Sequence, residues 1–216
     1  MDKQDIIKAL QAAREQSKER KFSQTVDLIV ALKGLNLKKP DEQVDLFVNL
    51  PNEVGKRRKV CALVGPEMVD KAKEACDTVV TQDEFDKYKE KKEAKKLADN
   101  HDYFIAQADI MPKVAGAFGR ILGPRGKMPN PKAGCILPPK AAVQPVVERL
   151  QKLAKVTAKK QLAIQLSVGD EQMSDEDIAD NIYTVYDQLI HHLPGEQNNV
   201  KHAYVKLTMG KPAIIS

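Results

Sequence analysis

A ten-residue stretch, GPRGKMPNPK at 123–132, constrains what this chain can fold into more than any other segment. Proline lacks the amide that a helix interior or a central strand needs, and glycine loses much conformational freedom in either. With two glycines and three prolines, the stretch is predicted to be a loop between two packed elements. Because the prolines stiffen it, its cations are predicted to be presented to a phosphate or an acidic partner; a stiff, soluble connector is the alternative.

The two ends of the chain share a second pattern, in which apolar and polar residues alternate. This period is typical of antiparallel strands with one face in water. Strands are predicted over four segments, 22–33, 44–50, 161–168 and 200–208. Helical spacing of the apolar residues predicts an amphipathic helix over 2–21 and a second helix that begins after the N-cap residue Ser174.

The middle of the chain has a different character. Val60–Val64 is a continuous apolar run, which is typical of a strand buried on both faces, and 103–106 is a second such run. These runs alternate with helical stretches, so a small parallel α/β layer is predicted. A short strand is expected at 78–80, and helices are expected from 67, over 82–98, over 110–122 and from Pro145 through Leu153.

Together the patterns predict a chain of mixed α/β and α+β class with two domains. Residues 1–64 and 157–216 are expected to form one discontinuous domain, with a single antiparallel sheet and two helices. The parallel unit, 65–156, is expected to be inserted between the second and third strands of that domain. Two crossings between the domains would make a hinge.

The net charge of +5 permits a nucleic-acid partner without requiring one. Residues 64–156 hold 17 Lys and Arg against 13 Asp and Glu, whereas the rest of the chain holds 18 against 17. Net charge by itself therefore favours the inserted unit as the nucleic-acid binder. The lysine-rich run Lys87–Lys96 has two interpretations, an RNA-facing helix or, more commonly for such runs, a solvated helix face with i,i+4 ion pairs.

Sequence motifs of enzymes are missing or broken. A phosphate-binding Walker loop would need a glycine where Ile121 stands and a Ser or Thr where Met128 stands. The glycine spacing does not fit a dinucleotide fingerprint, and there is no GxSxG elbow or catalytic arrangement of histidines. We therefore expect no enzyme, no cofactor and no metal, and keep a nucleotide- or small-molecule-dependent α/β enzyme as the alternative function.

The three cysteines, Cys61, Cys76 and Cys135, are far apart and lack metal-ligand spacing, which is typical of reduced, mostly buried thiols in a cytoplasmic protein. No apolar run is long enough for a membrane span, and the charged N-terminus does not fit a signal peptide. The expectation is a cytoplasmic protein without a membrane partner, monomeric when free.

Three motifs carry a specific resemblance: KFSQTVDL at Lys21–Leu28, GRILGPRGKMPNPKAG at Gly119–Gly134 and KLTMGKP at Lys206–Pro212. In this order, and across the whole chain, they are similar to the large ribosomal subunit protein one family of stalk proteins, in its archaeal type. The resemblance implies a split β-α-β domain and an inserted Rossmann-like, three-layer α/β domain. It also implies that the split domain holds the main RNA surface, against the charge count.

The resemblance further implies the partners and the site residues. The partners are large-subunit rRNA at the mobile side stalk of the large ribosomal subunit, deacylated exit-site tRNA whose release the protein assists, and its own mRNA leader or coding region, which it represses. The implied rRNA-binding residues are Lys21, Phe22, Thr25, His202, Lys206, Thr208, Met209 and Gly210. The implied interdomain or tRNA-facing loop residues are Gly123, Arg125, Gly126, Lys127 and Lys132. The chain departs from the family at His202, where serine is frequent, and at Leu207, where a hydroxyl residue is frequent.

The expected mechanism is recognition of folded RNA by its shape. The ends of antiparallel strands can be neighbours, so the start of the first strand and the end of the last are expected to meet. There, Phe22 and Met209 would shield hydrogen bonds from Thr25, Thr208 and the Gly210 backbone to phosphates and 2′-hydroxyls. A shielded bond left unmade costs about 1–3 kcal/mol, so a few contacts reject a wrong RNA shape.

Overall fold

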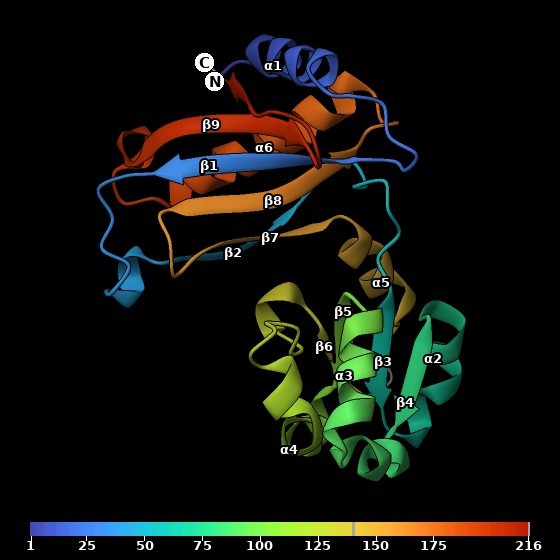
Figure 1. Ribbon diagram of the computed structural model, residues 1–216. Helices are drawn as coiled ribbons and strands as arrows, with labels where there is room; N and C mark the ends of the chain where they lie inside the picture. Colours follow the sequence, from blue (N-terminus) through green and yellow to red (C-terminus); the bar gives the residue numbers. More distant parts are fainter. Residues whose placement is uncertain (140, 216) are drawn as a thin grey trace. The chain divides into compact units, whose positions relative to one another are not determined.

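The structure is a computed structural model that describes residues 1–139 and 141–215 (Figure 1). The chain forms two compact units. The split unit comprises Met1–Lys56 and Lys152–Ser216, and the inserted unit comprises Arg57–Gln151. The mixed α/β class expected from the sequence is confirmed by the helices and the several sheets. Within the described ranges, no helix combines the length and the apolar character that crossing a membrane requires.

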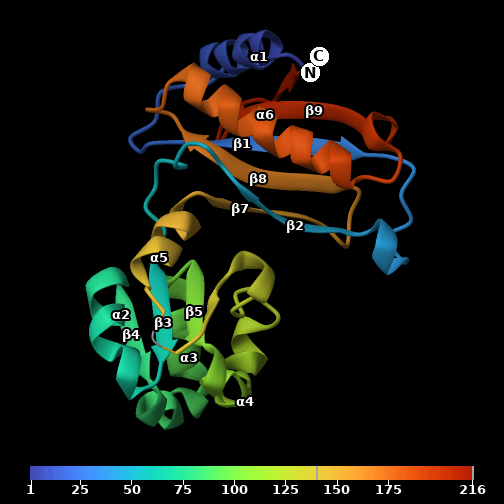
Figure 2. The same cartoon turned by 180° about the vertical axis from the view of Figure 1, so that it is seen from behind.

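The split unit is built on an antiparallel sheet in the order β10-β9-β1-β8. Its strands are β1 (Thr25–Leu32), β8 (Ala163–Asp170), β9 (Val200–Leu207) and β10 (Ala213–Ile215). Helices α1 (Lys3–Glu15) and α6 (Asp175–His192) lie against the same face of the sheet, as Figures 1 and 2 show from its two sides. The apolar side chains between the helices and the sheet form the core of this unit.

Buried and half-buried residues alternate along β1, as predicted. One face of the sheet is therefore covered by the helices, and the other points away from them. Buried Val26 and Leu28 alternate with half-buried Asp27 and Ile29. Across the sheet, Asp27 lies opposite Lys206 of β9. We call this second side the open face.

A two-stranded antiparallel ribbon, β2 (Val44–Asn49) with β7 (Leu153–Ala158), completes the strands of the split unit. The sequence pattern predicts a single sheet and a helix that continues through Leu153, and both predictions are wrong. Leu153 belongs to β7, where it pairs with Asn49. The reason is that a short apolar segment after a helix has too few residues to show a period. A strand and a last helical turn then look alike in the sequence.

The inserted unit contains a parallel sheet in the order β4-β3-β5-β6. Its strands are β3 (Val60–Val64), β4 (Thr78–Thr81), β5 (Tyr103–Gln107) and β6 (Ile136–Leu137). Its helices are α2 (Val69–Ala75), α3 (Lys91–Asn100), α4 (Met111–Leu122) and α5 (Gln144–Gln151). Every residue of β3 is buried, which confirms the predicted strand with two covered faces.

Short 3-10 helices occupy several connections: η1 (Pro40–Glu42), η2 (Pro66–Met68), η3 (Gln82–Lys89), η4 (Ala108–Ile110), η5 (Pro131–Ala133) and η6 (Glu196–Asn199). The single charged helix predicted over 82–98 is therefore two elements, η3 and α3, separated by an extended Glu90 with ψ of 122°. The break allows Phe85 of η3 to pack edge-on against Phe118 of α4, with ring centroids 5.4 Å apart, while α3 buries its own apolar side.

Other element ends also differ from the sequence expectations. Helix α1 ends at Glu15 rather than near residue 21, because the chain offers no apolar residue between Ala13 and Phe22 to pack on the core. The units change over after Lys56 and after Gln151, rather than after residues 64 and 156. The reason is that β3 pairs within the parallel sheet and β7 pairs with β2. The predicted cap of α6 is confirmed, since Ser174 Oγ accepts the Asp177 N–H at 3.1 Å.

Candidate nucleic-acid interface

The start of β1 and the end of β9 are joined by a pair of threonines. The Thr208 N–H donates to Thr25 O at 3.0 Å, which continues the strand ladder by one step. The Thr208 side chain then replaces the backbone as the partner of Thr25: Thr208 Oγ1 accepts the Thr25 N–H at 3.1 Å and lies 2.8 Å from Thr25 Oγ1. The prediction that these two strand ends are neighbours is confirmed.

Two large apolar side chains close to this pair in sequence are exposed to water. Phe22 is 53% exposed and Met209 is 60% exposed. Both lie close to the threonines along the chain, and the Met209 N–H donates to the side-chain oxygen of Gln24 at 3.1 Å. Met209 thus follows directly on the threonine pair, and Phe22 lines a hollow beside Glu171 and Gln172 at the end of the neighbouring strand β8. We call Phe22, Thr25, Thr208, Met209 and Gly210 the strand-end surface.

Gly210 closes the turn that follows β9. Its N–H donates to Leu207 O at 2.9 Å. A side chain at this position would place its Cβ 3.2 Å from Leu207 Cβ and 3.4 Å from Ser17 Oγ, so glycine allows the turn to lie close against the loop after α1. Lys21 is exposed and lines a hollow of about 400 Å³ together with Phe22 and Glu171.

The structure does not bring every predicted RNA-binding residue to this place. His202 lies on the open face opposite Ala31, six positions along β9 from Thr208. At roughly 3.3 Å per residue, that separation is about 20 Å. Lys206 is nearer to the threonines, and its neighbour across the sheet is Asp27. His202 therefore cannot share one small contact with Thr208, although the same open face carries both His202 and Lys206.

Sequence reasoning missed Gln24, which lies beneath the strand-end surface. Its side chain is fully buried and hydrogen-bonds to both Met209 and Ser17. A glutamine in the polar stretch KFSQT carries no periodic signal for burial, so nothing in the sequence pattern separates it from an exposed residue.

The proline loop at 123–132 is a loop, as predicted, but two of its three cations are held within the inserted unit. Lys127 Nζ donates to Ala98 O at 2.8 Å and to His101 O at 2.7 Å. Arg125 forms an ion pair with Asp99 at 2.6 Å. The last carbonyls of a helix lack helical donors, and here the loop supplies them at the end of α3.

The prediction that the loop presents its cations is therefore wrong for Lys127, whereas Arg125 is exposed and pairs with the exposed Asp99. Lys132 is exposed, and its ammonium makes no hydrogen bond or ion pair with another residue of the described chain. Two glycines have backbone reasons to be in the loop. Gly126 has φ of +66°, and a Cβ on Gly123 would lie 2.6 Å from Gly119 O.

Groups that could perform other chemistry are sparse. The three cysteines are free, and burial raises the pKa of the Cys76 thiol to about 11, which keeps it protonated. Over the described ranges, no three His, Cys, Asp or Glu side chains gather as a metal site would need.

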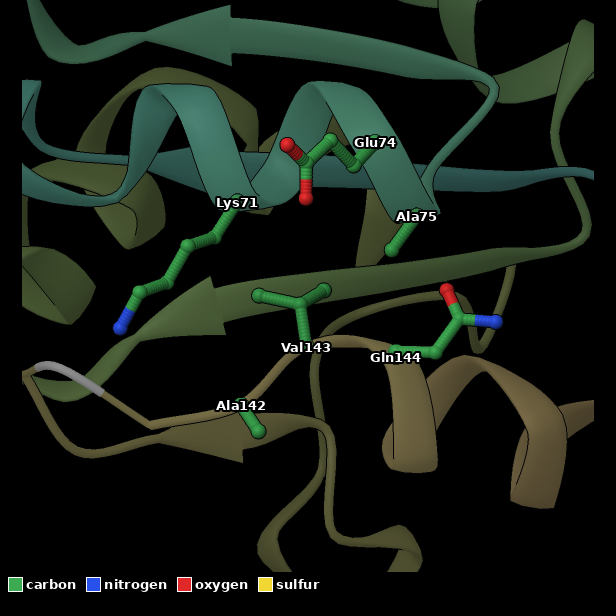
Figure 3. A pocket seen from close by; sticks show the side chains of 6 residues that line it. All are labelled: Lys71, Glu74, Ala75, Ala142, Val143 and Gln144. Atoms are coloured by element: carbon green, nitrogen blue, oxygen red, sulfur yellow. The ribbon is translucent and has the colours of Figure 1, made fainter.

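A hollow of about 380 Å³ in the inserted unit lies between α2 and the segment that leads into α5. Figure 3 shows Lys71 and Glu74 of α2 beside it, with Val143 on the other side.

Asp27 is an acidic group of the open face, and its burial generates a pH prediction. Burial raises the pKa of its carboxyl above the ordinary value of 3.8, although Lys206 acts in the opposite direction. The folded protein therefore binds this proton more tightly than the unfolded chain, and folding stability is lost as the pH rises through the raised pKa.

Asp27→Asn should accordingly raise the melting temperature at pH 7 and have little effect at about pH 3, below the ordinary carboxyl pKa. Thermal unfolding at both pH values checks this. The matched control is Asp41→Asn, an exposed aspartate of η1, which should change the melting temperature little at either pH. A lower melting temperature for Asp27→Asn at pH 7 would show that the attraction to Lys206 outweighs the burial.

Lys127→Met should destabilise the protein, because two carbonyl acceptors at the end of α3 lose their charged donor. Hydrogen bonds to charged groups contribute about 1.5–3 kcal/mol, so a loss of that order in the free energy of unfolding is expected from urea titrations. Lys132→Met is the control from the same loop and should unfold like the wild type. Equal unfolding midpoints for the two variants would contradict the capping role of Lys127.

Comparisons with known proteins place the chain in a family. A family model described as "Ribosomal protein L1p/L10e family" matches residues 13–211. A protein named "Large ribosomal subunit protein uL1" from Methanothermococcus thermolithotrophicus is 42% identical over 216 residues, which cover 100% of this chain and 99% of the relative. Proteins of the same name are 43% identical over 209 residues in Methanobrevibacter smithii, with 96% of each chain covered, and 37% identical over 216 residues in Archaeoglobus fulgidus, with 99% and 98% covered. The chain therefore belongs to the ribosomal protein L1p/L10e family, in its archaeal branch.

Proposed function

We propose that this chain is a structural constituent of the large ribosomal subunit and that its split unit binds large-subunit rRNA. The names of its relatives, large ribosomal subunit protein uL1, support the ribosomal part. The main support for the RNA-binding part is the strand-end surface, in which Thr25 and Thr208 are paired and the nearby residues Phe22 and Met209 are exposed. Family membership also confirms the expectation that the chain is not an enzyme.

The strand-end surface offers both components of RNA recognition. Aromatic rings stack on unpaired bases, and the flexible thioether of Met209 adapts to a sugar or a base. A hydroxyl has one donor and two acceptor sites. Thr208 Oγ1 accepts the Thr25 N–H and can donate to Thr25 O at 3.2 Å or to Thr25 Oγ1 at 2.8 Å. When it donates to Thr25 Oγ1, its second acceptor site is available to a 2′-hydroxyl. Burial of these bonds under Phe22 and Met209 would exclude water from them.

Recognition at this surface depends on shape more than on charge. Lys21 is exposed beside Phe22, whereas Lys206 faces the carboxyl group of Asp27 across the sheet. Other exposed cations close to the surface along the chain are Lys18, Arg20 and Lys211, so the surface has cations for a few phosphates. An RNA that places its sugars and bases correctly makes the shielded bonds, and an RNA of another shape leaves them unmade.

Two finer roles belong to the proposal. The first is assistance in releasing deacylated tRNA from the exit site, and for that contact the loop at 123–132 offers the exposed Arg125 and Lys132, whereas Lys127 is bound at the end of α3. The second is repression of the protein's own mRNA, through a hairpin that fits the same strand-end surface. Competition between rRNA and the mRNA for one protein distinguishes a shared surface from separate ones.

Thr208→Val should weaken rRNA binding strongly, because it removes the hydroxyl but keeps the branched shape. Loss of one or two shielded hydrogen bonds predicts a rise in Kd of about 10- to 100-fold. Filter binding with purified large-subunit rRNA measures it, and circular dichroism verifies the fold. Thr208→Ser keeps the hydroxyl and should bind within a few-fold of wild type. Affinity of the valine variant close to wild type would exclude this surface as the RNA site.

The salt dependence of rRNA binding should be shallow. Each neutralised phosphate adds roughly 0.7–0.9 to the slope of log Kd against log salt concentration. With only a few phosphates neutralised, that slope should be about 2–4. Replacing three exposed lysines of α3, Lys91, Lys92 and Lys95, with glutamine should leave that slope unchanged. A steep slope that falls in this triple variant would instead identify the lysine-rich helix as the binding element.

A further inference from the structure

Gln24 is fully buried and joins three parts of the split unit that are far apart in sequence. Its side-chain oxygen accepts the Met209 N–H at 3.1 Å, and its side-chain nitrogen donates to Ser17 Oγ at 3.3 Å. Its backbone exchanges two bonds with Glu171: the Gln24 N–H donates to Glu171 Oε2 at 3.0 Å, and the Glu171 N–H donates to Gln24 O at 2.8 Å. One buried residue therefore contacts the turn after β9, the loop after α1 and the turn after β8.

The partners of Gln24 are themselves fixed. The Ser17 N–H donates to Arg14 O at 3.0 Å at the end of α1. The guanidinium of Arg14 donates to Glu171 O at 2.7 Å and to Met173 O at 2.9 Å. The hydrogen bonds thus run from α1 through the β8–α6 turn to Gln24, so the carboxamide of Gln24 has little freedom to move.

The turn after β9 rests on this fixed group. Between the Thr208–Thr25 bonds on one side and the Gly210–Leu207 bond on the other, the Met209 N–H points inward to Gln24. With its backbone held in this way, Met209 directs its side chain to the solvent, where it is 60% exposed. Without the Gln24 oxygen, the described residues supply no other partner for that N–H.

We infer that Gln24 is the positioning residue of the strand-end surface: its carboxamide oxygen fixes Met209, and with it the turn that carries Thr208, before RNA arrives. The inference rests on the proposed function. A surface ordered in advance loses less conformational entropy on binding than a mobile one. Gln24 contacts no RNA itself, so its effect on affinity passes entirely through the turn.

The test compares two buried amides of the split unit. Gln24→Met keeps the length of the side chain but removes its hydrogen bonds. Asn181→Leu is the matched control, because Asn181 is also fully buried, accepts the Asn52 N–H at 3.0 Å and donates to Val168 O at 2.8 Å. Neither partner of Asn181 belongs to the strand-end surface.

Binding is measured with purified large-subunit rRNA from Methanobrevibacter smithii, well below the melting temperature of each variant. Gln24→Met should raise Kd about 3- to 10-fold, the effect of one or two side chains that must become ordered on binding. Asn181→Leu should lower the melting temperature but leave Kd unchanged. Met209→Ala should cost less affinity in the Gln24→Met background than in the wild type, because the two changes remove the same ordered group.

Three results would overturn the inference: wild-type affinity in Gln24→Met, an equal loss of affinity in Asn181→Leu, or additive effects of Gln24→Met and Met209→Ala. A measurement on the wild type covers the case in which Gln24→Met does not fold. In the RNA-free protein, the Met209 amide should exchange with solvent far more slowly than an exposed turn amide, and unprotected exchange would refute the inference. Failure of the wild type to bind the rRNA would reject the proposed function instead, whatever the amide exchange shows.

Discussion

The hydrogen bonds between Thr25 and Thr208 connect residues that are 183 positions apart and hold the strand-end surface together. Strand pairing between β1 and β9 ends at Val26 and Leu207, and the threonine hydroxyl extends it by one more step. That extension brings Met209 over Gln24 and keeps the following turn close to Ser17. The threonine hydroxyls that complete the pairing of β1 and β9 therefore lie at the end of these two strands, close in sequence to the exposed side chains of Phe22 and Met209.

The distribution of charge in the chain is a poor guide to this surface. The inserted unit, Arg57–Gln151, carries the whole positive excess, with 18 Lys and Arg against 13 Asp and Glu, yet several of its cations are used for structure. Lys127 and Arg125 supply donors to the end of α3, and Lys96 pairs with Glu93 along that helix. A count of charges cannot distinguish a cation that closes a helix from one that faces a ligand, because the difference lies in the acceptor that the fold brings near.

Local pattern predicted much of the architecture. The alternation in β1 and β9, the fully apolar run of β3 and the N-cap Ser174 all appear where the sequence placed them. These features depend on a short window, in which the period of apolar residues or a single hydroxyl determines the local structure. The failures come from longer-range effects: β7 forms because β2 is there to pair with it, and the charged run after β4 divides because Phe85 packs on Phe118.

By itself the sequence determined which segments become strands and helices, which residues stand at strand ends, and, through its motifs, the family to which the chain belongs. Only the tertiary structure decided which of those residues act together. It paired Thr25 with Thr208, placed His202 at the far end of β9, buried Gln24 beneath Met209 and turned Lys127 inward to α3. The physical reason is that periodicity records which side of an element is buried, whereas the partner of a polar group depends on segments that meet only when the whole chain has folded.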